Sequence, residues 1–227
     1  MTDLDFARAR TPEAKRARQE TILAAATRLA TAASVREVTA SAIADEVGMH
    51  KSAMLRYFET REDIFLQLAA DAWGEWSSAV RVELEDLAAG GRHDWDQAAA
   101  HEVASVVAHS LVARPLFCDL LAQTPLNLER NVSQEKVKAF KLRALAAVAE
   151  IGSALCVVTP LQLDQARSVV ATATAMAGAM WQMAAPGTNL RAFYESESEL
   201  AHAIVDVEPS LTDLLATLMI GYVARSI

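Results

Sequence analysis

The chain has 227 residues, which is enough for one or two domains with a substantial hydrophobic core. Apolar residues make up 52% of it and charged residues 22%, the profile of an ordinary soluble protein. Only eight glycines and six prolines occur, and no segment alternates Val, Ile, Thr and Tyr strictly, which argues against a strand-rich fold. The composition, rich in alanine and leucine, therefore predicts an all-α protein.

The formal net charge of −8 is distributed unevenly along the chain. Residues 1–61 hold ten Lys or Arg and eight Asp or Glu, a balance of +2. Residues 62–227 hold eleven and twenty-one, a balance of −10. This split is typical either of two solvated faces of unequal charge or of a small module that meets an anion, joined to a body that does not.

Two cysteines, Cys118 and Cys156, lie among apolar neighbours in segments predicted to be helical. Two lone cysteines make no disulfide framework and match no metal spacing. Free thiols suit a reducing compartment, and the N-terminal stretch MTDLDFARAR lacks the apolar core of a signal peptide. We therefore expect a cytoplasmic protein without a cofactor or a bound metal.

The first three predicted helices are short or amphipathic. Residues 12–33 repeat apolar side chains on one face at helical spacing. Residues 39–47 form a second helix, with Thr39 as its N-cap and Gly48 as its stop. Residues 50–57 form a third helix.

A long fourth helix is predicted from residue 60 to about 88. Thr60 is its cap, and Asp63 can reach back in the manner of a capping box. Gly90-Gly91 ends it. The only candidate domain boundary, near residue 66, falls within this helix, so the two parts of the chain would share a rigid element.

Six more helices are predicted, with no internal repeat or low-complexity linker between them. Thr159 before Pro160 and Ser210 with Asp213 mark two of the starts, and Thr124-Pro125 marks a break. The six helices span residues 94–112, 115–123, 133–157, 160–184, 191–205 and 210–225.

The most apolar of these segments is residues 169–185, VVATATAMAGAMWQMAA. It is built from small residues and contains Thr172, Thr174 and Gln182, whereas a membrane-spanning helix needs about 20 strongly apolar residues. We expect a helix that is buried on more than one side, and no membrane partner.

The second and third helices, joined by a turn with Gly48, have the layout of a helix-turn-helix. Packing of their small and apolar residues against each other leaves four polar side chains facing outward: His50, Lys51, Ser52 and Arg56. A helix that reads DNA needs such a face, with short donors near its start and cations that reach phosphates.

Residues 38–65, VTASAIADEVGMHKSAMLRYFETREDIF, resemble the DNA-binding segment of the TetR family of transcriptional regulators. The order and spacing of the family's motif are kept without a gap. The matching positions are Thr39, Ile43-Ala44, Gly48, Lys51, Tyr57-Phe58, Glu62 and Ile64-Phe65. The resemblance implies an N-terminal three-helix helix-turn-helix DNA-binding domain, residues 1–66, and a larger helical-bundle domain, residues 67–227, for ligand binding and dimerisation.

Four positions depart from the family's pattern. Leu55 stands where the family usually has a Tyr that contacts DNA, and His50 replaces the usual Ser or Thr. Ser52 replaces a common Gly, and Arg61 replaces a common Lys. The operator sequence therefore cannot be taken over from a better-known family member.

The outward face and the resemblance together select eight DNA-binding candidates: Thr39, Ser41, His50, Lys51, Ser52, Arg56, Tyr57 and Arg61. We expect Lys51 and Arg61 at phosphates, and Ser52 and Arg56 at base edges. Thr39 is a helix cap first, and the resemblance adds a phosphate contact. Two roles stay open, because His50 either caps its helix or touches a base, and Tyr57 either packs in the core or reaches a phosphate.

The resemblance also implies a ligand cavity in the body. Methionine and aromatic side chains suit an apolar ligand, although an ordinary core position is the alternative for each of them. The candidates are Trp73, Trp76, Phe117, Phe140, Met176, Met180 and Trp181. We expect a small effector that is apolar or amphipathic.

The helices at 160–184 and 210–225 are predicted to form a homodimer interface. The first is apolar nearly all round, so it needs a partner beyond its own core. Two such helices from each chain would close a four-helix bundle, which is the family's usual dimer. The alternative is a fully internal helix in a monomer.

We interpret the chain as a TetR-like transcriptional regulator, a homodimeric repressor that binds a palindromic double-stranded DNA operator and is released by a small molecule. One alternative is a DNA-binding regulator without such a ligand. Another is a helical enzyme or carrier that retains a helix-turn-helix scaffold. The sequence shows no constellation of catalytic residues, and His101 and His109 have no third ligand at metal spacing, so no catalytic or metal-binding residue is named.

Overall fold

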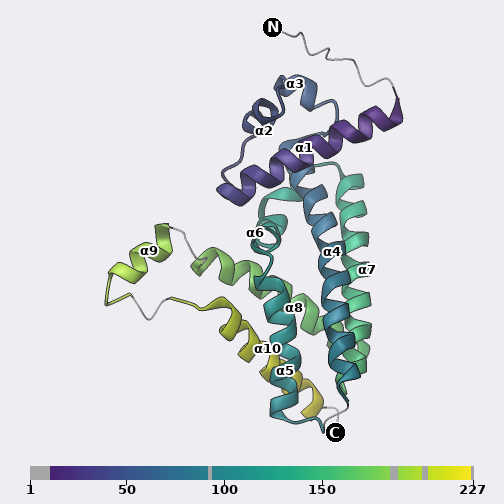
Figure 1. Ribbon diagram of the computed structural model, residues 1–227, viewed down its shortest axis with the longest axis vertical. Helices are drawn as coiled ribbons and strands as arrows, with labels where there is room; N and C mark the ends of the chain where they lie inside the picture. The colour runs from purple at the N-terminus through teal and green to yellow at the C-terminus, as the bar shows by residue number, and fades with distance from the viewer. Residues whose placement is uncertain (1–10, 92–93, 185–188, 201–203, 226–227) are drawn as a thin grey trace.

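The computed structural model describes residues 11–91, 94–184, 189–200 and 204–225. These residues form ten α-helices and one π-helical turn and contain no strand, which confirms the all-α expectation (Figure 1). The elements are α1 (Pro12–Ala32), α2 (Ala40–Glu46), α3 (Lys51–Met54), α4 (Arg61–Ala89), α5 (Gln97–Val112), α6 (Pro115–Gln123), η1 (Thr124–Leu128), α7 (Gln134–Val158), α8 (Leu163–Ala184), α9 (Asn189–Ser196) and α10 (Val207–Ala224).

Helices α1, α2 and α3 form a small unit at one end of the molecule. Thr39 caps α2, since its hydroxyl accepts a 3.1 Å hydrogen bond from the backbone N–H of Ala42, as the sequence predicts. Gly48 ends α2 with a φ of 63°, a left-handed conformation that favours glycine. Helix α3 is shorter than the predicted 50–57, because the chain after Met54 tightens into turns with hydrogen bonds to the third preceding residue.

The long helix α4 connects this unit to the body. The Thr60 hydroxyl accepts a 3.1 Å hydrogen bond from the backbone N–H of Asp63, and the Asp63 carboxylate accepts a 3.0 Å bond from the backbone N–H of Glu59. The first bond satisfies a donor that the helix start leaves free, and the second ties the Asp63 side chain to the residue before the cap. The predicted capping box is therefore present in a variant form. The glycines at 90 and 91 end the helix as predicted, with Gly91 at a φ of 106°.

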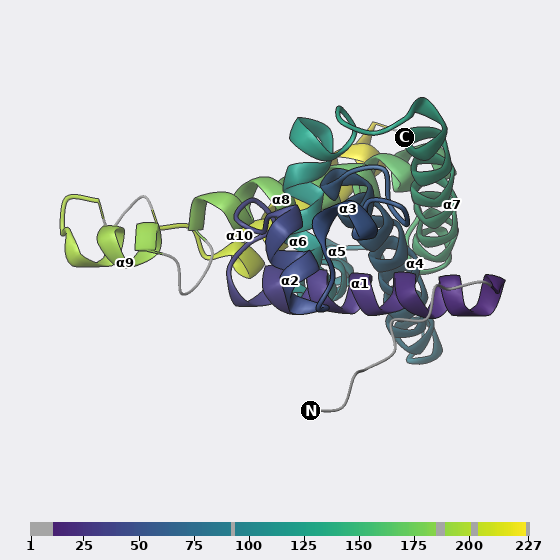
Figure 2. The ribbon, with the colours of Figure 1, turned by 90° about the horizontal axis from the view of Figure 1, so that it is seen from above.

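The body consists of helices packed around α4. Helix α7 lies beside α4, α5 pairs with α10, and α6 packs on α8. In Figures 1 and 2, α1 lies across the end of this bundle, and α8 and α10 lead away from it toward α9. Among the described residues, no single helix has both the length and the apolar composition needed to cross a membrane.

Four predicted helix boundaries in the body are wrong. Helix α5 begins at Gln97, three residues after the predicted start at 94, with Asp96 as its N-cap. Thr159 and Pro160 do not start α8, which begins at Leu163; the Thr159 hydroxyl instead donates to the carbonyl of Leu155 and closes α7. Helix α10 begins at Val207, one turn before the predicted Ser210. The predicted 191–205 helix is shorter, since α9 ends at Ser196.

The structure also differs from the sequence expectation at the 124–125 break and in the apolar segment 169–185. The predicted break at Thr124-Pro125 is a π-helical turn, η1, which continues directly from α6. The 169–185 segment lies mostly in α8, and its face toward the body is buried, but a stripe of Ala171, Ala175 and Ala179 is exposed in the single chain. A helix that is apolar all round therefore retains an uncovered face.

Candidate nucleic-acid interface

Helix α3 presents the polar face that the sequence predicts. The side chains of His50, Lys51, Ser52 and Arg56 are exposed, while Met54 on the opposite side is fully buried. His50 occupies the N-cap position without a hydrogen bond from its side chain to the helix start. Its capping role is therefore wrong, and contact with a base stays a prediction.

The cations of this face are free to meet an external anion. Among the residues that the structure describes, Lys51 and Arg56 have no ion-pair partner, whereas Arg28 of α1 pairs with Glu46 at 3.0 Å. An unpaired, exposed ammonium or guanidinium is the group that DNA phosphates and guanine edges attract. Ser41, in the first turn of α2, is also exposed.

Lys51 lies beside a surface hollow of about 540 Å³ between the start of α2 and α3. Its lining includes Thr39, Lys51 and Arg36, a basic residue that the sequence reasoning did not select. Arg36 precedes the cap of α2 by three residues and is exposed. No pattern along the chain distinguishes it from an ordinary surface arginine, because only the fold brings it next to Thr39 and Lys51.

Arg61 lies on the inner side of this hollow and has a structural role. Its guanidinium donates to the backbone carbonyls of Val35 and Val38, in the loop before α2, and its side chain is only 17% exposed. The guanidinium also stacks 4.7 Å from the centre of the Phe65 ring. These contacts favour a positioning role for Arg61 over the expected phosphate contact, which stays a prediction.

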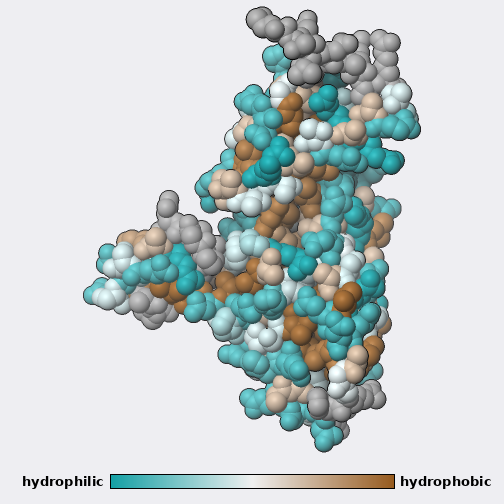
Figure 3. All heavy atoms as spheres, in the orientation of Figure 1, coloured by the Kyte–Doolittle hydropathy of each residue, from teal (hydrophilic) through white to brown (hydrophobic). Residues whose placement is uncertain are grey.

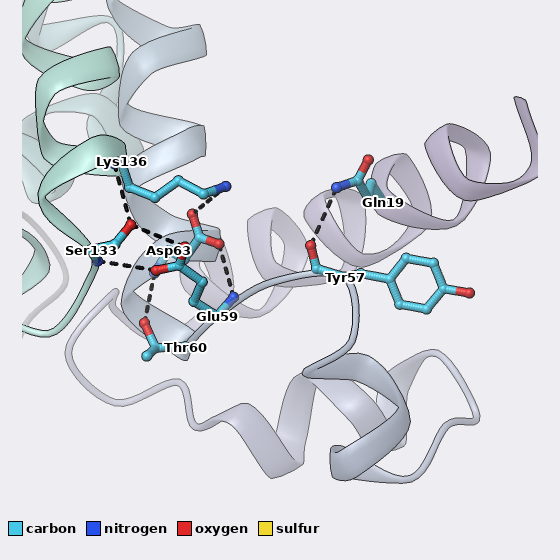
Figure 4. Close-up of polar contacts among 7 residues, drawn as sticks. All are labelled: Gln19, Tyr57, Glu59, Thr60, Asp63, Ser133 and Lys136. Carbon is cyan, nitrogen blue, oxygen red and sulfur yellow. Dashed lines mark hydrogen bonds and ion pairs between the residues drawn. The ribbon is translucent and has the colours of Figure 1, made fainter. Parts of the chain in front are cut away.

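Tyr57 and Phe58 close the unit against α1 and α4. Phe58 is buried, and the Tyr57 ring is half-buried against the core, while its backbone carbonyl accepts a 3.3 Å hydrogen bond from the Gln19 amide of α1 (Figure 4). The Tyr57 ring therefore packs against the core, which is one of the two roles that the sequence leaves open. A phosphate contact by its hydroxyl stays a prediction.

A polar cluster joins the end of the helix-turn-helix to the start of α7. The Glu59 carboxylate accepts hydrogen bonds of 3.0 Å from both the backbone N–H and the hydroxyl of Ser133, the N-cap of α7 (Figure 4). The buried Asp63 carboxylate pairs with the ammonium of Lys136 at 3.3 Å. Glu59 and Asp63 lie between the end of α3 and the first turn of α4. The cluster therefore fixes α7 to the unit of α1, α2 and α3, residues 11–60, which we call the reading unit because the sequence predicts that it reads DNA.

A second connection runs through Asp119 of α6, which is buried. One of its oxygens accepts a 2.7 Å hydrogen bond from the backbone N–H of Val35, and the other accepts a 2.8 Å bond from the Gln182 amide of α8. The loop before α2 is therefore tied to the body at Val35 by two residues, Asp119 and Arg61. Sequence reasoning missed Asp119, because an isolated aspartate in an apolar helix carries no motif.

The seven ligand-site candidates do not gather in one place. Trp73, Trp76 and Phe117 form a buried cluster with ring centres 5.5–5.7 Å apart, and the Trp76 indole donates to the Ser110 hydroxyl at 2.9 Å. Phe117 also lines a cavity of about 440 Å³, and Phe140 lines one of about 50 Å³. The remaining three, Met176, Met180 and Trp181, are half-buried along α8.

Titratable side chains in the body serve packing and surface pairing. His109 pairs with Glu208 at 3.0 Å and His101 with Asp213 at 3.7 Å, both between α5 and α10. Within the described ranges, no three His, Cys, Asp or Glu side chains are close enough to hold a metal ion. Burial, assisted by the charge of Asp119, raises the pKa of the Cys118 thiol to about 12.

Two family models match the chain. The model for bacterial regulatory proteins of the tetR family matches residues 22–68, which contain α2, α3 and the second half of α1. The model for the tetracyclin repressor-like C-terminal domain matches residues 71–226, more than half of the chain. The two matches meet within α4. No curated protein matches the chain.

Solved structures share the fold. A TetR-family transcriptional regulator from Mesorhizobium loti superposes with a TM-score of 0.55 at 12% identity, over 93% of this chain and 97% of that one. The transcriptional regulator FadR from Bacillus subtilis, solved in complex with stearoyl-CoA, gives a TM-score of 0.50 at 15% identity, over 87% and 97%. At such identities the likeness establishes the architecture alone.

Proposed function

The chain belongs to the TetR family of transcriptional regulators, and from this premise we propose that it is a homodimeric repressor of a palindromic operator. The observation that carries this proposal is the outward face of α3, where Lys51 and Arg56 are exposed and unpaired within the described residues. The buried side of the same helix, at Met54, anchors it to the unit. A recognition helix needs this combination of a fixed back and a cationic front.

The contacts that we propose divide into two kinds. Lys51 and Arg36, with the backbone and hydroxyl at Thr39, bind phosphates and set the register of α3 in the major groove. Ser52 and Arg56 contact base edges, and a bidentate bond from Arg56 to guanine would specify one position. Leu55, 36% exposed, offers an apolar surface to a thymine methyl group where the family's usual Tyr would offer a hydroxyl.

The proposed dimer uses the uncovered faces of α8 and α10. The exposed stripe of α8 consists of alanines, and on α10 Thr217 and Gly221 are exposed beside half-buried Leu214 and Leu218. Small residues allow close approach of helices, and a symmetric four-helix arrangement would cover both faces at once. These exposed faces support the proposal because, within the part of the chain that the structure describes, their apolar surface is not covered.

A small apolar or amphipathic molecule is the proposed effector. It would favour a state in which the two recognition helices no longer match successive major grooves, about 34–36 Å apart. The ligand can shift this equilibrium only by its differential affinity for the two states. A fold relative, FadR from Bacillus subtilis, was solved with stearoyl-CoA, which has a long apolar tail.

Footprinting on a selected operator fragment tests this function. We expect hydroxyl-radical cleavage to be suppressed at two sites about one helical turn apart, at a stoichiometry of two chains per fragment. A single protected site bound by one chain would contradict the dimeric repressor.

A further inference from the structure

A cavity of about 440 Å³ lies where the reading unit meets the body. Its walls come from three helices, namely the second half of α1, the first half of α4 and the start of α6. Figure 3 shows apolar side chains just below α1 on one face of the molecule, in the region where α4 and α6 approach it. The volume falls within the range of small-molecule sites, roughly 300–1,000 Å³.

The inner surface of this junction cavity is apolar. Leu68 and Ala72 of α4 face Leu116, Phe117 and Leu120 of α6 across it. Phe117 is held in place by its ring contacts with two tryptophans. A rigid aromatic and aliphatic lining of this kind favours a ligand that is mostly hydrocarbon.

The rim of the cavity carries charges that cancel in pairs. Asp71 pairs with Arg143 at 2.9 Å, and Glu75 pairs with Arg114 at 3.0 Å. A charged ligand would have to compete with these existing partners, since each charged side chain among the described lining residues already has one. The rim therefore disfavours both anions and cations.

Two hydroxyl groups on the α1 wall remain for polar contacts. Thr27 and Thr31 line the cavity, and within the described part of the chain their hydroxyls make no hydrogen bond. A hydroxyl donates one hydrogen bond and accepts others, so it matches an alcohol or a carbonyl group. The ligand that this site fits is consequently neutral, with one or two such groups.

The cavity wall is continuous with the connection to the reading unit. Phe117 and Leu120 of the cavity wall lie on the same helix as Asp119, two positions before it and one after it, and the Asp119 carboxylate accepts from the backbone N–H of Val35 before α2. On its other side α6 packs closely on α8, where a Cβ at Gly178 would come within 2.9 Å of the backbone nitrogen of Ala122. Because α8 restrains that side, Asp119 is the contact through which a displacement of α6 at the cavity would reach Val35.

We propose that this junction cavity binds a neutral, largely apolar small molecule with a hydroxyl or carbonyl group, and that its occupancy moves the loop before α2 through Asp119. The regulatory part of this inference rests on the proposed repressor function. Since one wall belongs to the reading unit and two belong to the body, a ligand that contacts all three changes the preferred angle between them.

Fluorescence titration with N-phenylnaphthylamine, a neutral apolar probe, tests the site. Anilinonaphthalene sulfonate has the same rings with an added anion and is the matched control for ligand charge. Ala72→Phe fills the junction cavity, and Thr31→Trp covers its exposed rim from α1. Ala88→Phe is the matched control, because it is the same change on the same helix but lies in a separate cavity of about 480 Å³ at the far end of the body.

We expect both junction variants to weaken binding of the neutral probe by about tenfold or more, with Ala88→Phe unchanged. Helical circular dichroism and the melting temperature verify that each variant is folded. If Ala72→Phe does not fold, Thr31→Trp alone still tests the site. Binding that survives in Thr31→Trp and Ala72→Phe, or that is lost equally in Ala88→Phe, would overturn the assignment. Equal affinity for the sulfonate would overturn the ligand class.

Amide hydrogen exchange at Val35 tests the coupling without DNA. Saturation with N-phenylnaphthylamine should change the exchange rate of the Val35 N–H by about threefold or more, and Asp119→Ala should abolish the change. If the exchange rate of the Val35 N–H does not change on saturation, the proposed coupling is wrong even if the probe binds. If no specific operator is found, the proposed repressor function is wrong, but the exchange result still shows whether the cavity is coupled to Val35.

Discussion

The backbone N–H of Val35, in the loop before α2, donates a 2.7 Å hydrogen bond to the buried carboxylate of Asp119 in the body. The two residues are 84 positions apart in the chain. The Val35 carbonyl accepts from Arg61 of α4, so both polar groups of this peptide position are held by other helices. The orientation of the reading unit is therefore coupled to α6 and α4 at a single loop.

Asp119→Ala should lower the free energy of unfolding by about 2–3 kcal/mol, because it leaves the buried Val35 N–H without an acceptor and removes a hydrogen bond to a charged group. Gln182→Ala is the control. It removes only the exposed partner on the other carboxylate oxygen, so its cost should stay below about 1 kcal/mol. Urea unfolding measures both, and equal costs would show that the bond to Val35 contributes nothing particular.

Arg61→Ala should destabilise the reading unit, whereas Lys51→Ala should not. The Arg61 guanidinium satisfies two backbone carbonyls of the loop, and its loss should cost about 1–3 kcal/mol. Lys51 is exposed without a partner in the described residues, so its change should lie within about 0.5 kcal/mol. Chemical denaturation of the two variants decides this, and an unaffected Arg61→Ala would return Arg61 to the group of phosphate contacts.

Contacts between residues that are close in the chain can be predicted from this sequence, whereas contacts between distant residues cannot. The sequence predicts the capping roles of Thr39, Gly48 and Thr60, which the structure confirms, because capping depends on residues only a few positions away. The inward direction of Arg61 depends on carbonyls up to 26 positions away, and the acceptor role of Asp119 depends on one still farther away. No local pattern encodes such contacts.

The start of α8 illustrates the same limit at the level of helix boundaries. Thr159 before Pro160 has the pattern of a helix start, yet the threonine hydroxyl is used by the preceding helix. Serine and threonine hydroxyls compete for backbone groups on either side, and tertiary packing decides between the two. The cavity at the junction cannot be predicted from the sequence either, since its walls come from three helices that only the fold brings together.

Lys51→Ala should weaken binding to every DNA sequence by a similar factor. Each phosphate contact releases condensed counterions, so the slope of log affinity against log salt should flatten by about one unit. Lys141→Ala on α7 is the control, because that ammonium pairs with Glu129 at 2.7 Å, far from the face of α3. Fluorescence anisotropy over a range of salt gives the slopes, and an unchanged slope for Lys51→Ala would remove its assigned role.

Arg56→Ala should act on specificity. If its guanidinium binds a guanine edge through two hydrogen bonds, discrimination at one base position should fall by about 1–3 kcal/mol. The preference at all other positions should persist, and the salt slope should change less than for Lys51→Ala. Competition against a library with single base substitutions measures this, and a uniform loss at all positions would identify Arg56 as a phosphate contact instead.

The stability of the protein should fall with pH above about 9 through Cys118. Burial raises the pKa of this thiol from 9.0 to about 12, so the folded state retains the proton that the unfolded state loses. The stabilisation is thus full below pH 9, decreases as the pH rises toward 12, and has decreased by about 1 kcal/mol at pH 10. Urea titrations of wild type and Cys118→Ala compare the slopes, and parallel pH profiles would contradict the shift.

The most direct test of the account is selection of bound fragments from the source genome at about 0.15 M salt, with wild type and Lys51→Ala in parallel. We predict one palindromic motif for the wild type, its half-sites about one helical turn apart, and strongly reduced recovery for the variant. Salt-sensitive binding without an enriched motif would contradict the account, because the face of α3 would then hold DNA without reading it.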